Sequence, residues 1–184
     1  GGEVRTSTEV VGIRAGESET VIETSGGAIA ARAVINCAGL FSDRIARMAG
    51  ERPEVQIVPF RGEYYDLVPE RAELVRALIY PVPDPRFPFL GVHFTRRVHG
   101  TVDAGPNAIF AFKREGYRSG DFSFRDTVES LVFPGFWRVA AKHWRMGKDE
   151  AARSVSKAAF VAGLQKLVPD VRAEDLVPGG SGVR

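Results

Sequence analysis

Residues 87–112, FPFLGVHFTRRVHGTVDAGPNAIFAF, constrain the fold most because they predict a β-hairpin. Residues 90–96 form the expected first arm, residues 97–100 the connection, and residues 101–105 the second arm. Aromatic and β-branched side chains fill both arms, and Gly100 stands at the turn, where a positive φ is expected. The chain is therefore expected to contain an antiparallel sheet.

Strand alternation places two polar side chains of the first arm, His93 and Thr95, on one face, whereas Val92, Phe94 and Arg96 point to the other. A buried polar pair needs partners, either within the protein or on a ligand. The residues alone leave two roles open for His93: a structural histidine with local partners, or a histidine that contacts a ligand.

Short apolar and β-branched runs between glycine-rich turns predict further strands. Gly105-Pro106-Asn107 is expected to break the second arm of the hairpin. Gly62 lies inside a long predicted strand, where glycine is typical of a bulge or of close approach by a ligand. Besides the hairpin arms, the predicted strands are residues 10–13, 20–24, 28–33, 34–38, 56–67, 108–112 and 175–178.

Apolar residues at helical spacing predict the helices. Ser42 or Asp43 is expected to cap the first helix, and Gly147 to end the fourth. Trp137 and Trp144 are expected to pack in the interior. The predicted helices are residues 41–49, 70–77, 125–132, 135–146 and 150–167. Together the elements predict an α+β fold with a mixed, largely antiparallel sheet and helices packed on one side.

The composition is ordinary for a folded domain, with 44% hydrophobic residues, 26% charged residues and a net charge of +2. This balance argues against a nucleic-acid surface. The single Cys37 excludes an internal disulfide, is expected to be buried, and fits a cytoplasmic location. The basic residues 138–148 suggest either a peripheral membrane contact or a solvated helix face. No spacing of side chains typical of a metal site is present.

Gly39 separates the apolar run at residues 34–38 from the first predicted helix. Such a strand–glycine–helix joint brings backbone N–H groups close to a ligand, and a helix N-terminus favours negative charge. Many joints of this kind bind nothing, so the joint alone does not decide a function.

Four stretches closely resemble the L-2-hydroxyglutarate oxidase/dehydrogenase family, whose members are FAD-dependent enzymes of the D-amino acid oxidase-like superfamily. The block at residues 79–107 is the most specific, and the N-terminal strands resemble the superfamily only loosely. The stretches are VINCAGLFSDRIARMAG (34–50), IVPFRGEYYDL (57–67), LIYPVPDPRFPFLGVHFTRRVHGTVDAGPNAIFAFKREGY (78–117) and LVPGGSGVR (176–184).

The chain departs from the family at the dinucleotide-binding motif G-x-G-x-x-G, which does not occur here between a strand and a helix. The resemblance implies a partial FAD domain with a β-meander at residues 1–50, a substrate domain at residues 51–170, and a strand returning to the FAD domain at residues 171–184. We therefore expect a piece of a longer enzyme that holds FAD only when intact and is inactive and colourless alone.

The reaction implied by the resemblance is oxidation of the C2 hydroxyl of L-2-hydroxyglutarate to 2-oxoglutarate. A hydride passes to the flavin and a base takes the hydroxyl proton. The alternatives are a related flavin oxidase acting on an amino acid, a glycine derivative or glycerol 3-phosphate, and a catalytically inactive docking domain. The electron acceptor, oxygen or a membrane quinone, stays open, as does the oligomeric state.

The resemblance also assigns site residues. Arg184, in the sequence Gly182-Val183-Arg184, is expected to hold the C1 carboxylate through its guanidinium fork. Arg61 is expected to hold the second carboxylate or a flavin edge, or else to form a salt bridge with Glu63 or Asp66.

His93 is the expected base, because an ordinary histidine pKa of about 6.5 suits proton abstraction near neutrality. Thr95 is expected to hydrogen-bond the substrate. His99 and His143 are expected to be surface residues. The residues expected near FAD, mainly through backbone groups, are Asn36, Ala38, Gly39, Gly62 and Gly182.

Overall fold

The computed structural model describes residues 1–83 and 91–184. These form two compact units, residues 1–57 and residues 58–184, and each is described by itself. Leu90, the first residue of the predicted hairpin arm, lies outside the described residues. The domain boundaries expected from the sequence differ from this division and stay a prediction.

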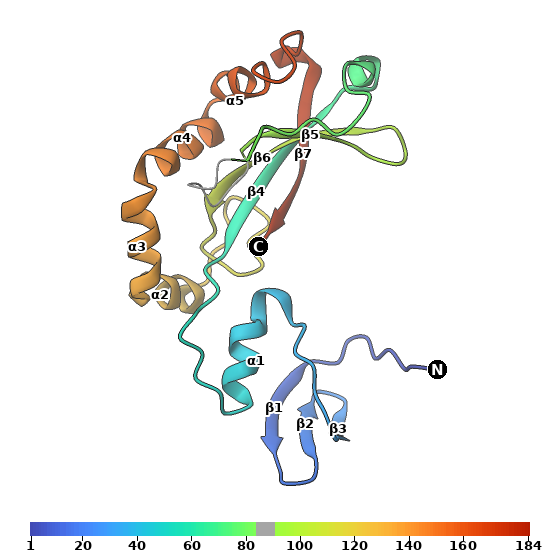
Figure 1. Cartoon of the computed structure of the whole chain (residues 1–184), viewed down its shortest axis with the longest axis vertical. Helices are drawn as coiled ribbons and strands as arrows, with labels where there is room; N and C mark the ends of the chain where they lie inside the picture. Colours follow the sequence, from blue (N-terminus) through green and yellow to red (C-terminus); the bar gives the residue numbers. More distant parts are fainter. Residues whose placement is uncertain (84–90) are drawn as a thin grey trace. The chain divides into compact units, whose positions relative to one another are not determined.

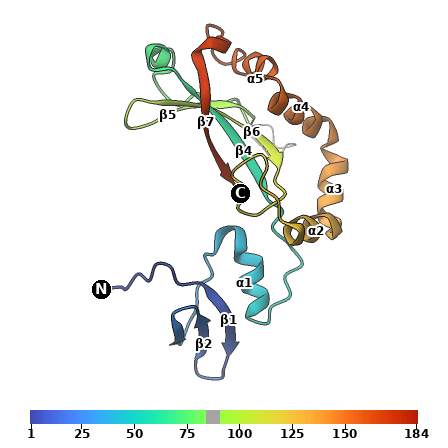
Figure 2. The same ribbon diagram turned by 180° about the vertical axis from the view of Figure 1, so that it is seen from behind.

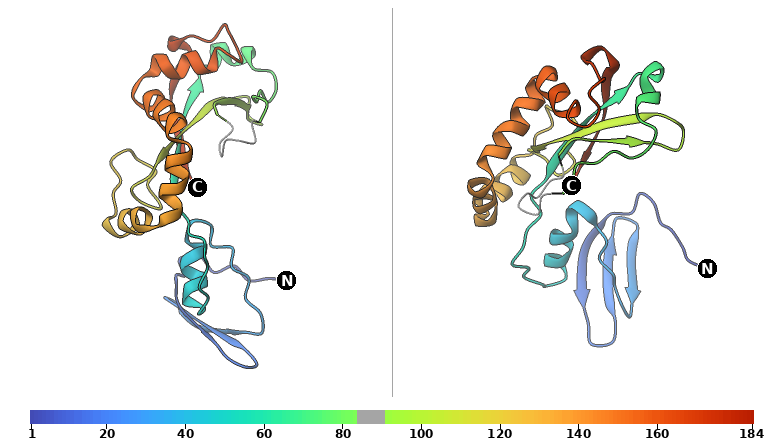
Figure 3. Two further views of the ribbon diagram at one scale, coloured as in Figure 1. Left: turned by 60° about the vertical axis from the view of Figure 1, so that its left-hand side comes forward. Right: turned by 45° about the horizontal axis from the view of Figure 1, so that its top comes forward.

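The first unit contains the predicted N-terminal meander. Strands β1 (Val10–Ala15), β2 (Thr20–Thr24) and β3 (Gly27–Ala31) lie side by side in antiparallel order (Figure 3). Thr24 pairs with Gly27 across a tight turn, and Gly27 adopts a φ of 113° that favours glycine. The alternating apolar pattern and the glycine turn therefore predicted this sheet correctly.

The predicted strand at residues 34–38 is wrong, because these residues form no ladder. Ile35 is 86% exposed, and Cys37 is exposed rather than buried. An apolar strand of this kind needs neighbours on both edges. Within residues 1–57, which the structure describes in full, no strand pairs with this run.

Helix α1 (Ser42–Met48) follows a 3₁₀ turn at Gly39–Phe41. Its N-cap is Phe41, so the predicted capping by Ser42 or Asp43 is wrong. Asp43 is instead buried inside the helix, where it pairs with Arg47 and accepts a hydrogen bond from the backbone N–H of Ile57.

The second unit is built on a four-stranded antiparallel sheet in the order β5-β6-β4-β7 (Figures 1 and 2). Strand β5 (His93–Arg96) and strand β6 (Val102–Phe110) form the predicted hairpin, with His93 opposite Gly105. Strand β4 (Phe60–Leu67) lies between β6 and the last strand.

Strand β6 does not break at Gly105-Pro106-Asn107 as predicted. It continues through this sequence with a bulge, because Gly105 and Pro106 together stand opposite the single residue Tyr64 of β4. The bulge accommodates a proline that cannot donate to the ladder.

The glycine-rich C-terminal run is part of a strand. Strand β7 (Leu176–Val183) pairs with β4 along its whole length, with Leu67 opposite Leu176 and Gly62 opposite Gly182. The residues alone predicted an extended segment only at residues 175–178, whereas the family resemblance implied a strand over residues 171–184. Main-chain hydrogen bonds to β4 order the remaining glycines although they offer no side chains to pack.

Four helices follow one another along one side of this sheet (Figures 1 and 2). The predicted helix at residues 150–167 divides at Ser156, whose hydroxyl caps the last helix by accepting from the N–H of Ala159. The preceding break falls at His143 rather than at Gly147. The helices are α2 (Phe124–Val132), α3 (Pro134–Lys142), α4 (Trp144–Val155) and α5 (Lys157–Leu164).

Two smaller predictions also need correction. The predicted helix at residues 70–77 is a 3₁₀ helix at Pro69–Leu74. Trp137 is 56% exposed and Trp144 is 60% exposed, so neither is an interior residue of the described chain.

The hydrophobic core lies where α5 and the inner face of the sheet meet. Phe94, Ala104 and Leu164 are fully buried, and Tyr65 packs on Phe160 with ring centroids 4.9 Å apart. This core marks one sheet face as inner, so side chains that alternate with the core residues point to the outer face.

Candidate active site

The candidate site lies on the outer face of the sheet in the second unit. Phe94 points into the core, so its neighbours His93 and Thr95 point outward. On β4, Tyr65 packs inward on Phe160, and Tyr64 therefore lies on the outer side.

Arg184 shares this face. Its carbonyl oxygen accepts from the N–H of Phe60 at 2.8 Å, and its own N–H donates to the carbonyl oxygen of Phe60 at 3.0 Å. Residues that stand opposite each other in a ladder point to the same side of the sheet. Burial is the main cause of the pKa shifts of His93 and Tyr64, and the positive charge of Arg184 acts to lower the pKa of both. The fold thus brings together His93 and Arg184, which are 91 positions apart in the sequence.

The imidazole of His93 is held in one orientation. Its Nδ1 lies 3.1 Å from the carbonyl oxygen of Gly91, and the ring of Tyr80 stacks on it with centroids 4.1 Å apart and planes 18° apart. A carbonyl oxygen only accepts, so Nδ1 carries the hydrogen and the lone pair is on Nε2. The Tyr80 hydroxyl lies 3.2 Å from Oγ1 of Thr95, which joins the two outward residues of β5.

Burial is the main cause that lowers the pKa of His93, and the charge of Arg184 acts in the same direction. The hydrogen bond with Gly91 opposes both but does not cancel them. His93 is therefore neutral at pH 7, and Nε2 is available to accept a proton.

Tyr64 is a site residue that the sequence did not predict. Burial raises the pKa of Tyr64, so its hydroxyl stays protonated and able to donate near neutrality. The available signal was its position two residues after Gly62, which places both on one face of a strand.

Arg61 lies on the inner side of β4, away from His93. It is 5% exposed, pairs with Oε1 of Glu63 at 2.7 Å, and donates to the carbonyl oxygen of Arg118 at 2.9 Å. Of the roles left open by the sequence, the salt bridge with Glu63 is the one observed.

Gly62 and Gly182 are glycine for different structural reasons. A Cβ on Gly62 would lie 2.9 Å from Cβ of Pro106, so local packing already requires glycine there. A Cβ on Gly182 would meet nothing within 4 Å. Gly182 therefore leaves a flat, open part of the sheet next to Arg184, which suits a planar ring system such as a flavin.

The predicted cofactor residues at positions 36–39 belong to the first unit. The side chain of Asn36 accepts from the N–H of Ala38 at 3.1 Å and donates to the carbonyl oxygen of Ser42 at 2.8 Å, so it orders its own loop. Gly39 has a φ of 53° with open space around its Cα. This geometry permits close approach by a ligand, and the cofactor role of these residues stays a prediction.

The part of the chain that the structure describes holds neither a metal cluster nor a helix that could span a membrane. Within residues 1–83 and 91–184, no three His, Cys, Asp or Glu side chains gather in a way that would hold a metal ion. None of the helices in those ranges has the length and apolar character needed to cross a bilayer.

The family described as FAD dependent oxidoreductase matches residues 1–184. The chain belongs to this family.

Curated relatives are named L-2-hydroxyglutarate dehydrogenase. The protein from Indibacter alkaliphilus is 50% identical over 100% of this chain and 46% of its own length. The Escherichia coli K12 protein is 47% identical over 100% of the chain and 44% of its length, and the human mitochondrial protein is 44% identical over 100% and 42%. The chain thus spans about half the length of the curated relatives it matches.

Solved structures of flavin oxidases share the fold. L-α-glycerophosphate oxidase from Mycoplasma pneumoniae aligns with a TM-score of 0.60 at 15% identity, over 96% of this chain and 38% of that one. Glycine oxidase from Geobacillus kaustophilus aligns with a TM-score of 0.50 at 21% identity, over 96% and 36%. These likenesses confirm the predicted α+β architecture.

Proposed function

We propose that this chain supplies the substrate-binding face of an FAD-dependent L-2-hydroxyglutarate oxidoreductase. The observation that carries the proposal is the placement of His93 and Arg184 on one sheet face. The names of relatives at about half identity over the full chain support the choice of substrate.

In this proposal Arg184 binds the carboxylate next to C2, because a guanidinium matches a carboxylate with two parallel hydrogen bonds. Nε2 of His93 accepts the proton of the C2 hydroxyl, since Nδ1 is already committed to Gly91. Tyr64 offers a protonated hydroxyl to a substrate oxygen. Arg61 has no direct role in this site.

FAD fits the surface beside Gly182 in the second unit. The cofactor role predicted for Asn36, Ala38 and Gly39 of the first unit is a separate proposal. When bound, the flavin supplies the acceptor for the hydride that leaves C2. The protein contributes orientation of the carboxylate, neutralisation of its charge and a base of suitable pKa.

The direct test is anaerobic flavin bleaching in the intact, flavin-loaded protein. We expect L-2-hydroxyglutarate to bleach the flavin and the D-enantiomer not to. Arg184→Met should raise the substrate concentration for half-bleaching by about tenfold or more, because a charge-assisted pair is lost. Bleaching only by glycine or glycerol 3-phosphate would instead support one of the related oxidases. If none of these compounds bleached the flavin, the catalytically inactive domain would be supported.

We also propose that the intact enzyme is cytoplasmic and touches a membrane surface peripherally, where a quinone would take its electrons. Trp137 and Trp144 are more than half exposed on α3 and α4, and aromatic rings with interspersed cations favour an anionic interface. The neighbouring cations are Arg138, Lys142, Arg145 and Lys148.

Vesicle flotation tests this contact. The intact protein should float with vesicles containing phosphatidylglycerol and remain unbound with pure phosphatidylcholine. Replacing both tryptophans by serine should abolish flotation. Equal flotation with the two lipid compositions would exclude a contact based on charge, and no flotation with either would support the solvated helix face.

A further inference from the structure

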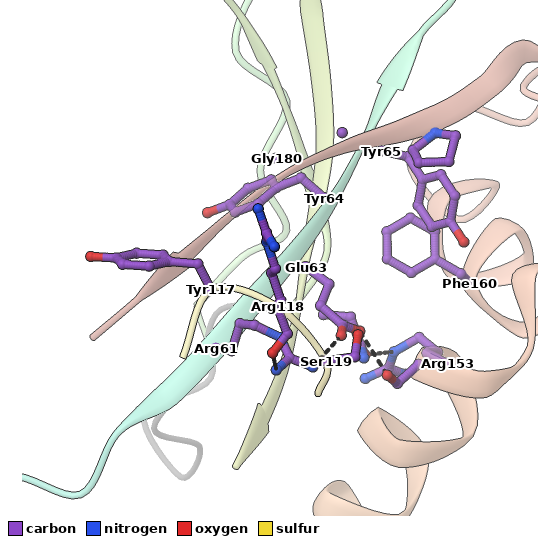
Figure 4. A pocket seen from close by; sticks show the side chains of 14 residues that line it. Arg61, Glu63, Tyr64, Tyr65, Tyr117, Arg118, Ser119, Arg153, Phe160 and Gly180 are labelled. Carbon is purple, nitrogen blue, oxygen red and sulfur yellow. Dashed lines mark hydrogen bonds and ion pairs between the residues drawn. The ribbon is translucent and has the colours of Figure 1, made fainter. Parts of the chain in front are cut away.

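A hollow lies on the inner side of the sheet, between β4, β7 and the helices α4 and α5 (Figure 4). Its volume is about 440 Å³, within the range of about 300–1,000 Å³ typical of small-ligand sites. We propose that this hollow binds a small organic carboxylate at a site separate from the proposed catalytic face.

Positive charge predominates in the lining. The described residues around the hollow include three arginines, Arg61, Arg118 and Arg153, and one acidic residue, Glu63. Glu63 already accepts on both carboxylate oxygens, from Arg61 at 2.7 Å and from the hydroxyl of Ser154 at 2.7 Å. Arg153 also pairs with Glu150 outside the lining. Three arginines therefore face one glutamate in the lining. Even when Glu150 is counted as a second acid, the net charge around the hollow is positive and favours an anion.

Asn107 supplies a buried donor without an acceptor. The residue is 1% exposed, and its Oδ1 faces Nε of Arg153 at 3.4 Å. That contact orients the amide, and its Nδ2 has no hydrogen-bond partner among the residues that the structure describes. Buried donors are nearly always paired, so the unpaired N–H group of a residue lining the hollow indicates a missing acceptor.

The opposite wall is apolar. The ring of Tyr65 lies against Phe160 there, as Figure 4 shows, and Pro178 adds a further apolar surface. A wall of this kind suits the short carbon chain of an organic acid, whereas inorganic phosphate would leave it without a partner. The donors and the wall together fit a carboxylate joined to a few methylene groups.

The hollow and the catalytic face are adjacent through one strand. Arg61, Glu63 and Tyr65 point inward. Tyr64, which stands opposite the bulge of β6, borders the hollow and also interacts electrostatically with Arg184. The binding proposed here does not depend on the proposed reaction, because it is measured without turnover.

Calorimetry with glutarate as the probe tests the site in the intact, flavin-loaded protein. Arg184→Met serves as the background, because it weakens carboxylate binding at the proposed catalytic face. We expect one remaining glutarate site per chain. Arg118→Ala in this background should weaken it by about tenfold or more, because a charge-assisted hydrogen bond is lost.

Arg118 lies on an exposed loop and its backbone carbonyl, which holds Arg61, is kept in the alanine variant, so the variant should fold. Arg125→Ala, which removes an exposed arginine of α2, is the matched control and should leave the affinity unchanged. Asn107→Leu, checked for folding by its melting temperature, should also weaken glutarate binding.

Three results would overturn the proposal. The first is the absence of any glutarate site in the Arg184→Met background. The second is equal affinity in the Arg118→Ala and Arg125→Ala variants. The third is tighter binding of inorganic phosphate than of glutarate, which would exclude the carboxylate class. None of these results bears on flavin bleaching, so the two proposals fail separately.

Discussion

His93 owes its chemical character to three neighbours from different parts of the chain. The carbonyl of Gly91 selects the tautomer, the ring of Tyr80 fixes the plane of the imidazole, and the charge of Arg184 adds to burial in lowering its pKa. Burial and Arg184 disfavour the protonated imidazole, whereas Gly91 and Tyr80 fix its orientation. At neutral pH the result is a base whose lone pair points away from its own backbone.

Replacing His93 by Asn tests its role as the base. The Asn amide can still donate toward Gly91, but it has no basic nitrogen, so kcat should fall about a hundredfold to ten-thousandfold. Steady-state kinetics on the intact enzyme measure this. His99→Asn, in the exposed turn of the hairpin, is the control and should leave kcat unchanged. Equal losses in the two variants would contradict the assignment.

The pH dependence of kcat/KM provides a second check on His93. The rate requires the neutral imidazole, so it should rise with pH through the pKa of His93 and level off above it. Because burial and Arg184 lower this pKa, the acidic limb should lie below the ordinary value of 6.5. The limb should vanish in His93→Asn, and a limb at or above 6.5 would argue for a different base.

Tyr80 is expected to act as a positioning residue. Tyr80→Phe keeps the ring stacked on His93, whereas Tyr80→Ala removes it, so only the alanine variant should lower kcat, by about tenfold. KM should change little in either variant. An equal effect of both substitutions would show that the hydroxyl contact with Thr95, rather than the stack, is important.

At the level of elements, the bulge in β6 at Gly105 and Pro106 depends on the glycine. Gly105 has a φ of 144°, and a Cβ there would lie 2.9 Å from the carbonyl oxygen of Glu63 and 3.0 Å from Cδ1 of Tyr64. The close approach of two backbones at this point sets the position of Tyr64 on the outer face.

Gly105→Ala should therefore destabilise the protein by about 1–3 kcal/mol, since both the φ and the contact with backbone are unfavourable. Chemical denaturation of the intact enzyme measures the free energy of unfolding. Gly120→Ala is the matched control, because a Cβ at Gly120 meets nothing within 4 Å. Similar midpoints for both variants would mean that the strand shifts freely to accept a side chain.

At the level of the whole molecule, the two units differ in how they are stabilised. The second unit has a contiguous core around Phe94, Phe160 and Leu164. In the first unit, residues 1–57, all of which are described, Asp43 is the only buried residue. Backbone ladders without a buried apolar cluster give little resistance to opening.

Hydrogen exchange on the 184-residue chain tests this difference. Amides of β1 and β2 should exchange much faster than those of β4 and β6, because local opening of the first unit exposes little apolar surface. Mass spectrometry of peptides from the two units gives the rates. Equal protection of the strands in the two units would show that the first unit has stabilising contacts beyond its own ladders.

The sequence alone determined those features that depend on neighbours a few residues away. The hairpin, the N-terminal meander and the α+β class follow from period-two alternation and from glycine at turns. The pairing of His93 with Thr95 on one face follows from the same alternation. The family resemblance to flavin-dependent 2-hydroxy acid enzymes also rests on contiguous stretches, such as residues 79–107.

Only the tertiary structure decided which partners meet across the chain. It placed Arg61 on the inner face with Glu63, and it made the glycine run a strand through its ladder to β4. It also left residues 34–38 unpaired. Hydrogen-bond partners and burial depend on segments far apart in sequence, and local propensity carries no information about them.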